Sequence, residues 1–445
     1  MDDFIDNERI LVYDFIMNEN GWKSRWSFDQ LRAMLLEQFD AFWERESGIQ
    51  RSALATVEKA VSLPHAVIIS GLRRVGKSTL LLQIAHKIGK NNFYYLNFED
   101  DRFINFRAED MDDLYQLFVE FFGVRKIFIF DEIQNVKGWE HFVRRFMDLG
   151  HKFYISGSNA SLLSKDLGTL LTGRYVPIEL FPFSFQEYLQ FNNQAIPDLM
   201  RMKTSDQAQL KHALGEYLIR GGIPDALKYP EIPLTRTLYD DILYRDIAAR
   251  LRIDSIESLK QLAFFLISNP GAIISYNKLK ERFKLGSVNT ISSYIALMEN
   301  SWLFLVINRY AFSVKRQLVL PKKIYSIDTG MAETVGFHFS PNTGKLLENL
   351  VFLTLRRKTS EIYYYATAGD YEVDFFLPEE GLLIQVAQNL EKDGTREREF
   401  RALAATAKEL RVEKAIILTD HNENDVVVEQ LPVQILSVSE WLLSV

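Results

Sequence analysis

The sequence predicts an α/β protein built from several domains. Its 445 residues exceed what a single hydrophobic core usually holds. From about residue 64, short apolar runs alternate with amphipathic helices, which is typical of a parallel sheet covered on both faces. We expect five units: an N-terminal helical segment (1–60), an α/β core (61–187), a helical lid or linker (188–260), a winged helix (261–335) and a second, separate α/β unit (342–445).

Composition excludes several classes of protein. Lys plus Arg is 52 and Asp plus Glu is 59, so the net charge of −7 argues against a surface that is basic throughout, although a local basic face remains open. The absence of cysteine excludes disulfides, zinc fingers and cysteine nucleophiles. No apolar run approaches the about 20 residues that span a bilayer, and the chain opens Met1-Asp2-Asp3 rather than with a basic secretory start. We therefore expect a soluble, cytoplasmic protein without a membrane partner.

The N-terminal segment is expected to be helical. Leu31, Leu35, Phe39 and Trp43 recur at a four-residue spacing, which places them in one stripe along a helix. We expect this stripe to pack on the α/β core. A contact between copies of the chain is the alternative.

The strongest motif lies at the first turn of the α/β core, after a strand expected at 65–69. It matches G-x-x-x-x-G-K-[ST], the P-loop pattern, and a helix is expected to follow at 79–88. Glycines let the backbone amides turn inward around phosphate, and the helix N-terminus adds positive potential. Lys77 is expected to reach the β- and γ-phosphates of ATP, and the Ser78 hydroxyl to bind Mg²⁺. The predicted nucleotide site comprises Gly71, Leu72, Arg73, Arg74, Val75, Gly76, Lys77, Ser78, Thr79 and Asp131.

Two adjacent carboxylates follow the strand expected at 126–130. Asp131 and Glu132 end an unbroken apolar run, so they are expected at the carboxyl edge of the parallel sheet. There Asp131 is expected to hold Mg²⁺ through water, and Glu132 to orient and deprotonate the water that attacks ATP.

A small polar turn follows the next strand, at 152–156. Either Asn159 or Ser158 is expected to hydrogen-bond the γ-phosphate or the attacking water, because both carry donors. Two further strands of the core are expected, one at 93–98 and the last at 175–180.

Helices dominate from 188 to 300, with a break at 220–224. Three helices and then two strands, at 302–309 and 323–327, predict a winged helix with its recognition helix at 287–299 and its wing at 314–321. In the second α/β unit we expect helices at 346–357 and 395–410 and strands at 362–365, 373–376, 382–386 and 415–418.

The winged-helix region carries an excess of basic residues. Between residues 276 and 323 there are nine Lys or Arg and two Glu, so this stretch holds a charge of +7 and the remaining chain −14. The recognition helix itself contains no Lys or Arg, which favours non-specific or structure-directed contact with DNA over base readout. A protein-binding winged helix is the alternative. The DNA-binding candidates are Lys278, Lys280, Lys284, Lys315, Arg316, Lys322 and Lys323.

Several of these segments resemble one family. The P-loop, the Asp-Glu strand, the turn 156–159 and the stretch 171–174 resemble prokaryotic AAA+-type ATPases, in particular those fused to a C-terminal restriction-endonuclease-like domain of unknown function. The stretches 182–188, 221–224 and 244–247 resemble that family's linker signature. The resemblance covers roughly residues 60–445 and implies an AAA+-like core. It also implies that Arg174 acts on ATP bound by a neighbouring subunit. One alternative is a structural Arg174 that caps a strand or pairs with Glu179. Another places Arg73 or Arg74 in the catalytic role.

The same resemblance implies a nuclease-like fold at the C-terminus. Its pattern is a helical glutamate, a strand aspartate and a Glu-x-Lys on the next strand, with the carboxylates binding Mg²⁺. Glu348 and Asp374 match the first two places, but Gln385-Val386-Ala387 replaces the third. We therefore expect the fold without the nuclease activity, and Lys392 is a poor substitute for the missing lysine.

Together these features predict a Mg²⁺-dependent ATPase that couples hydrolysis to movement of the winged-helix and C-terminal units on DNA, either as a single copy or as a homo-oligomer. One alternative is a nucleotide-gated switch that presents its C-terminal unit to a protein partner in stress or defence signalling. Another is an ATP-regulated nuclease.

Overall fold

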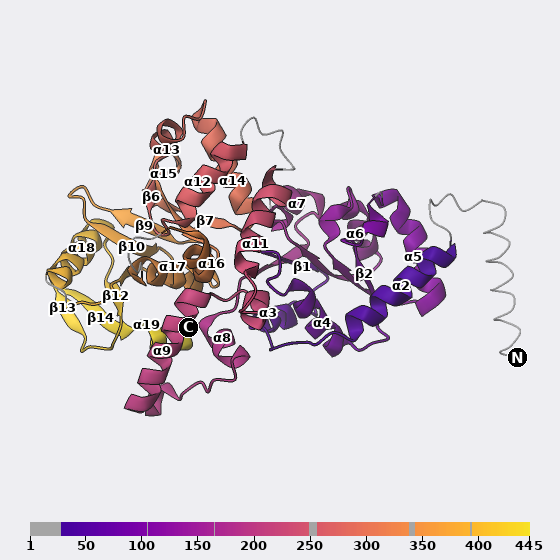
Figure 1. The fold of residues 1–445 in the computed structure, drawn as a ribbon, viewed down its shortest axis with the longest axis horizontal. Helices are drawn as coiled ribbons and strands as arrows, with labels where there is room; N and C mark the ends of the chain where they lie inside the picture. The colour runs from indigo at the N-terminus through magenta and orange to yellow at the C-terminus, as the bar shows by residue number, and fades with distance from the viewer. Residues whose placement is uncertain (1–27, 105, 164, 249–255, 338–342, 392–393) are drawn as a thin grey trace, which may run out of the picture.

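The computed structural model describes residues 28–104, 106–163, 165–248, 256–337, 343–391 and 394–445. The part of the predicted N-terminal helix before residue 28, and Lys392, lie outside the described residues. Figure 1 shows two lobes, one around each of two sheets, with the helical segment between them. Among the described helices, none is long and apolar enough to cross a membrane.

The first lobe contains a five-stranded sheet whose strands all run parallel, in the order β2-β3-β4-β1-β5. Strand residues alternate between two cores: Val67 and Ile69 face one, whereas Ala66 and Ile68 face the other. Both faces are therefore covered, as the apolar runs predict. The strands are β1 (Ala66–Gly71), β2 (Phe93–Asn97), β3 (Ile127–Asp131), β4 (Lys152–Gly157) and β5 (Tyr175–Leu180).

Helices cover this sheet. The helix α2 (Phe28–Trp43) lays its apolar stripe on the sheet, where the rings of Phe39 and Phe93 lie 5.5 Å apart. The other helices of the lobe are α3 (Ala53–Lys59), α4 (Lys77–Ile88), α5 (Met111–Phe122), α6 (Trp139–Asp148) and α7 (Lys165–Leu170), with short 3₁₀ turns η1 (Asp101–Phe103), η2 (Ala108–Asp110), η3 (Ile133–Asn135) and η4 (Ala160–Leu163).

A helical segment joins the lobes. It contains α8 (Phe185–Phe191), η5 (Leu199–Arg201), α9 (Thr204–Arg220), α10 (Pro224–Lys228), α11 (Leu234–Asp241) and the π-helical turn η6 (Ile242–Ile247). The break after Arg220 has a tertiary cause. A Cβ on Gly221, which has φ +73°, would lie 2.1 Å from Asp328 Oδ1, and Gly222 N donates to Asp328 Oδ2 at 2.7 Å. Only glycine allows this close approach.

The region 256–335 contains the predicted three helices followed by two strands, with a further two-residue strand. Its elements are α12 (Ile256–Ile267), β6 (Ile273–Ile274), α13 (Tyr276–Arg282), α14 (Val288–Asn300), β7 (Phe304–Arg309), α15 (Val314–Val319), β8 (Lys322–Ser326) and α16 (Thr329–Val335). The segment predicted as an extended wing is instead the short helix α15.

The second sheet has nine strands in the order β13-β14-β12-β11-β10-β9-β7-β8-β6. The expectation of a separate C-terminal unit was wrong, because β7 pairs in parallel with β9 and one sheet runs through both regions. The remaining elements are α17 (Thr343–Arg356), β9 (Tyr363–Ala366), β10 (Glu372–Leu377), β11 (Leu382–Val386), α18 (Thr395–Leu410), β12 (Lys414–Thr419), β13 (Val426–Val428), β14 (Leu431–Ser437) and α19 (Val438–Ser444).

Candidate nucleotide site and its connections

The loop between β1 and α4 has the geometry of a phosphate cradle. Gly71 passes so close to β5 that a Cβ there would lie 2.2 Å from Leu180 O, and Gly76 has φ +95° at the start of α4. Both positions therefore require glycine. Leu72 and Val75 are buried in the core and anchor the loop, which leaves its amides at the N-terminus of α4.

Lys77 lies at the centre of this loop. The side chain is 4% exposed, and Nζ donates to Gly71 O at 3.2 Å and to Leu72 O at 3.1 Å. It also lies 3.2 Å from Glu132 Oε1. The structure thus joins the predicted phosphate-binding lysine to the predicted catalytic carboxylate.

Asp131 ends β3 and is fully buried. Its carboxylate accepts hydrogen bonds from the Ser78 and Ser156 hydroxyls, and Tyr95 Oη lies 3.5 Å from it. Burial raises the pKa of Asp131 and the neighbouring Glu132 raises it further, while the hydroxyls and Lys77 oppose this. Ser78 and Asp131, predicted to share Mg²⁺, are therefore in contact.

A hydroxyl and a carboxylate suit Mg²⁺, which takes oxygen ligands and usually completes its shell with water and phosphate oxygens. Over the described ranges, the structure as it stands has no group of three or more His, Asp or Glu side chains that could hold a metal ion. The donor set of Ser78 and Asp131 therefore fits an ion that arrives with a nucleotide.

Glu132 is held by three donors. Its carboxylate lies 2.6 Å from Gln134 Nε2, 3.1 Å from the backbone N of Ser158 and 3.2 Å from Lys77 Nζ. Burial alone would raise its pKa, but the charge of Lys77 and the hydrogen bond from Gln134 outweigh burial and lower it. The carboxylate is therefore ionised at neutral pH and fixed beside the phosphate loop.

The tip of β4 lies next to these groups. Ser158 is buried near Glu132, and the backbone carbonyl of Asn159 accepts a hydrogen bond from Ser70 Oγ at 2.9 Å. Both candidates for the γ-phosphate contact thus lie at the expected edge, and the choice between them stays a prediction.

Arg174 lies at the opposite edge of the sheet. Its carbonyl accepts from the N–H of Ala66, at the amino end of β1, whereas the phosphate loop follows the carboxyl end. Its guanidinium pairs with Asp148 at 2.6 Å. The alternative pairing with Glu179 was wrong, because that carboxylate binds Arg356. Arg174 therefore cannot reach the phosphate loop of its own chain.

Arg73 connects the phosphate loop to the helical segment. Its Nε lies 2.8 Å from Asp246 Oδ2 in η6, and its Nη1 lies 2.8 Å from Glu99 Oε1. Asp246 lies in the stretch 244–247, which resembles the family's linker signature, but the sequence did not predict its pairing with Arg73. Arg74 is exposed and has φ +60°, consistent with a turn position.

Sequence reasoning missed Arg51, which supports the loop from behind. The side chain is 4% exposed. Its Nε bonds Glu187 at 3.1 Å, its Nη1 bonds Val75 O at 2.8 Å and its Nη2 bonds Phe181 O at 2.7 Å. The Ser-x-x-Glu capping box at Ser184 and Glu187 was the available signal for the partner. No local pattern marks Arg51 itself.

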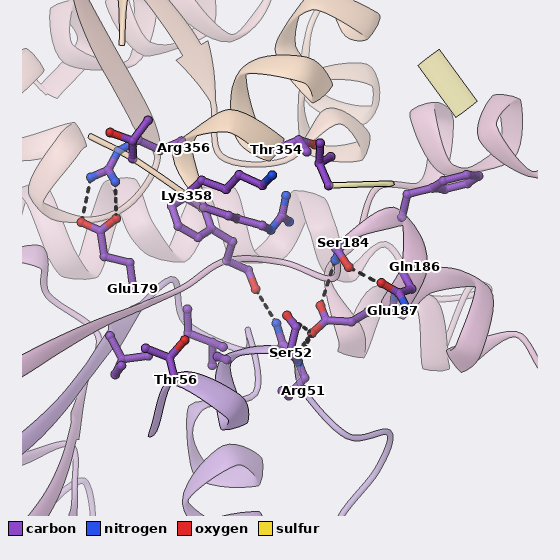
Figure 2. A pocket seen from close by; sticks show the side chains of 18 of the residues that line it. Arg51, Ser52, Thr56, Glu179, Ser184, Gln186, Glu187, Thr354, Arg356 and Lys358 are labelled. Carbon is purple, nitrogen blue, oxygen red and sulfur yellow. Dashed lines mark hydrogen bonds and ion pairs between the residues drawn. The ribbon is translucent and has the colours of Figure 1, made fainter. Parts of the chain in front are cut away.

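Arg51 also lines a cleft of about 540 Å³ between the core and α17. Figure 2 shows the Arg356–Glu179 pair on one side of this cleft and the Arg51–Glu187 network on the other. The charged groups of these two networks are already paired within the chain. The cleft therefore lies between the two lobes, and through Arg51 it borders the residue that bonds Val75 in the phosphate loop.

A second link between lobes starts at Trp302, which is buried in the turn before β7. Its Nε1 donates to Ser70 Oγ at 3.1 Å, and Ser70 Oγ in turn donates to Asn159 O. Ser70 immediately precedes the phosphate loop. The C-terminal lobe thus contacts the tip of β1, and Ser70 connects this contact to the turn after β4.

The structure changes the set of DNA-binding candidates. Lys323 is 1% exposed and bonded to three carboxylates, so we correct its assignment as a surface contact. Lys322 is half-buried and bonds Asn308; burial lowers its pKa and Glu299 opposes this. Of the remaining candidates, Lys280 is half-buried, and the exposed ones are Lys278, Lys284, Lys315 and Arg316.

The nuclease-like residues do converge. The N–H of Asp374 donates to Gln385 Oε1 at 3.1 Å, while Glu348 and Asp374 each lie 2.9 Å from Lys323 Nζ. Gln385 Nε2 donates to Glu399 Oε2 at 2.7 Å. Lys323 and Glu399 were both missed as members of this cluster, because they come from other elements.

Three segments of the chain match models of known protein families. Residues 64–189 match an AAA domain, 211–341 a domain of unknown function (DUF8612) and 343–440 another domain of unknown function (DUF4143). The chain is 34% identical to the uncharacterized protein MJ1544 of Methanocaldococcus jannaschii over 401 residues, 86% of this chain and 89% of that protein. It is 33% identical to an uncharacterized protein of Haemophilus influenzae over 338 residues, 72% and 82% of the two chains.

Among solved structures, the chain is similar to the Walker-type ATPase PABY2304 of Pyrococcus abyssi. The TM-score is 0.41 at 14% identity, over 66% of this chain and 99% of that one.

Proposed function

The chain belongs to the family that includes MJ1544 of Methanocaldococcus jannaschii, and from this premise we propose that it is a Mg²⁺-dependent ATPase whose hydrolysis moves the C-terminal lobe on DNA. The observation that carries the proposal is the convergence at one sheet edge of Lys77, Glu132, Ser78 and Asp131. A P-loop ATPase needs a lysine for the phosphates, a hydroxyl and a carboxylate for Mg²⁺, and a second group that positions the attacking water.

Each side chain has a role in this proposal. Lys77 and the loop amides bind the β- and γ-phosphates, and Ser78 and Asp131 hold Mg²⁺, which neutralises charge that develops on the phosphates. Glu132 orients the attacking water and accepts its proton. Asn159 or Ser158 contacts the γ-phosphate or that water.

Coupling between lobes is supported by two contacts. Arg73, inside the phosphate loop, bonds Asp246, and Trp302 bonds Ser70 at the loop's first strand. A change in loop position on nucleotide binding therefore acts directly on the helical segment and on the C-terminal lobe. Arg174, which faces away from its own phosphate loop, fits a role in the site of a neighbouring copy and favours a homo-oligomer.

The DNA role rests on the basic residues that remain exposed. In this proposal α12–α14 with β6–β8 form a winged helix in which α15 replaces the wing. Lys315 and Arg316 on α15 contact phosphates, which predicts salt-sensitive binding without base readout.

The experiment measures ATP hydrolysis with and without duplex and single-stranded DNA. DNA should stimulate the wild type, and Lys77→Ala should abolish turnover. Lys315→Ala with Arg316→Ala should weaken DNA binding and lower the salt slope of the binding constant by about 2, one per lost phosphate contact. Lys408→Ala with Lys414→Ala removes the same charge from exposed positions elsewhere and serves as the control.

If no DNA stimulates hydrolysis, or if both double variants lower DNA affinity equally, the DNA part of the proposal is wrong. The ATPase part would stand on its own result.

A second function is favoured by α15. The helix and the short segment before it expose several large apolar side chains, namely Phe312, Val314, Leu318 and Val319. Such a face suits a protein partner better than DNA. The fixed, low-pKa Glu132 also suits slow turnover. This combination supports a nucleotide-gated interaction switch, which predicts ATP binding with little stimulation by DNA.

A further inference from the structure

One buried lysine in the C-terminal lobe is surrounded by carboxylates. Lys323, on β8, places its Nζ 2.9 Å from Glu348 Oε1, 2.9 Å from Asp374 Oδ1 and 2.6 Å from Glu372 Oε1. The three acids come from α17 and β10, whereas the lysine comes from a strand of the preceding region. A single ammonium therefore bridges two parts of the nine-stranded sheet.

Neighbouring groups hold two of the acids in place from other directions. Tyr325 Oη donates to Glu348 Oε1 at 2.8 Å, and Val386 N donates to Asp374 Oδ2 at 3.0 Å. The Glu348 carboxylate is also covered by Gly271, where a Cβ would lie 3.0 Å from it. These carboxylates are thus fixed so that an oxygen of each points at one place, the position of Nζ.

Three carboxylates so close together need a cation. Burial and then the charge of Asp374 raise the pKa of Glu348 to about 7, against the opposing effects of Lys323 and of the hydrogen bond from Tyr325. Carboxylate oxygens that converge on one point are also the ligands that hard divalent ions prefer, with Ca²⁺ accepting oxygens at about 2.3–2.6 Å. The oxygen–nitrogen distances around Lys323 are only slightly longer.

We propose that the Lys323 ammonium is a built-in cation, which occupies the position where Glu348, Glu372 and Asp374 would otherwise bind a divalent metal ion. In this role it clamps β8 to β10 and α17, so the carboxylates hold the lobe together instead of serving hydrolysis. An open pocket of about 510 Å³ is lined in part by Glu372 and Asp374, so two of the three acids border a space that an ion can enter.

The test removes the ammonium and asks whether a metal ion replaces it. Lys323→Ala should lower the melting temperature, and Ca²⁺ should restore it. The same variant should bind Tb³⁺ with luminescence sensitised by Tyr325, about ten-fold or more tightly than the wild type. Lys322→Ala is the matched control, because that neighbouring lysine bonds Asn308 and not the acids.

A second variant covers the case in which Lys323→Ala does not fold without added metal. Lys323→Met combined with Glu348→Gln removes one charge of each sign, so it should fold without a cation and bind Tb³⁺ poorly. Lys323→Ala should then refold only when Ca²⁺ is present.

Equal Tb³⁺ affinity in Lys323→Ala and Lys322→Ala would overturn the proposal. Tyr325-sensitised Tb³⁺ binding to the wild type with the affinity of Lys323→Ala would overturn it as well, because the ammonium would then not compete for the position. Neither readout uses ATP, so the result is independent of the proposed hydrolysis.

Discussion

Replacing Arg51 by methionine is the sharpest test of how the phosphate loop is supported. Methionine keeps much of the length and removes the charge. The change breaks the buried ion pair with Glu187 and frees the carbonyls of Val75 and Phe181, which accept from the guanidinium at 2.8 and 2.7 Å. Val75 is part of the phosphate loop, so both stability and ATP affinity should fall.

The size of the effect follows from burial. Both partners of the pair are about 4–5% exposed, and breaking a buried pair by removing one partner typically costs about 3–5 kcal/mol. We expect Arg51→Met to lower the free energy of unfolding by about 4 kcal/mol. Adding Glu187→Gln removes the uncompensated charge and should recover about 2 kcal/mol, although the carbonyls stay unpaired.

Urea denaturation gives the stability, and titration with ATP gives the affinity. Arg125→Met is the control. This guanidinium bonds Phe93 O at the start of β2 and Phe122 O at the end of α5, away from the phosphate loop, so stability should fall without a change in ATP affinity. A double variant no more stable than Arg51→Met would show that the lost ion pair is not the cause of the destabilisation. If Arg51→Met binds ATP as tightly as Arg125→Met, Arg51 does not support the phosphate loop.

Two further predictions concern other buried charges. Burial raises the pKa of Glu299 to about 7, against a hydrogen bond from the Val306 N–H, so folding favours the protonated form and stability should fall as pH rises from 5 to 8. Glu299→Gln should match the wild type near pH 5 and exceed its stability by up to about 3 kcal/mol at pH 8, and parallel pH profiles in thermal unfolding would contradict this. Asp246→Asn should weaken the bond to Arg73 by about 1 kcal/mol. The backbone amides of residues 242–248 should then exchange hydrogen roughly five-fold faster. Unchanged exchange rates would show that the Arg73–Asp246 pair does not hold this segment in place.

The nucleotide site was largely predictable because its signals are local. A buried strand, glycines at a forced turn and polar residues at strand tips suffice to place Lys77, Asp131 and Glu132 on one sheet edge. Similar local signals existed for β14 but were overlooked: Leu431, Val433 and Ile435 alternate with more exposed positions.

The partners of buried charges were not predictable in the same way. Arg51 meets Glu187 across 136 positions, and Lys323 meets Asp374 across 51. A lysine in a basic stretch looks like a surface contact until the sheet pairing places it among acids. The β7–β9 pairing, which merges two expected domains, likewise leaves no pattern within either strand.

The most direct test of the central claim is the rate of ATP hydrolysis by the wild type and by Glu132→Gln, with ATP binding measured on both. We expect the variant to bind ATP and to hydrolyse it at least about 100-fold more slowly, because the group that activates water is lost. Hydrolysis by the variant at the wild-type rate, or no hydrolysis by the wild type with Mg²⁺ and DNA present, would contradict it.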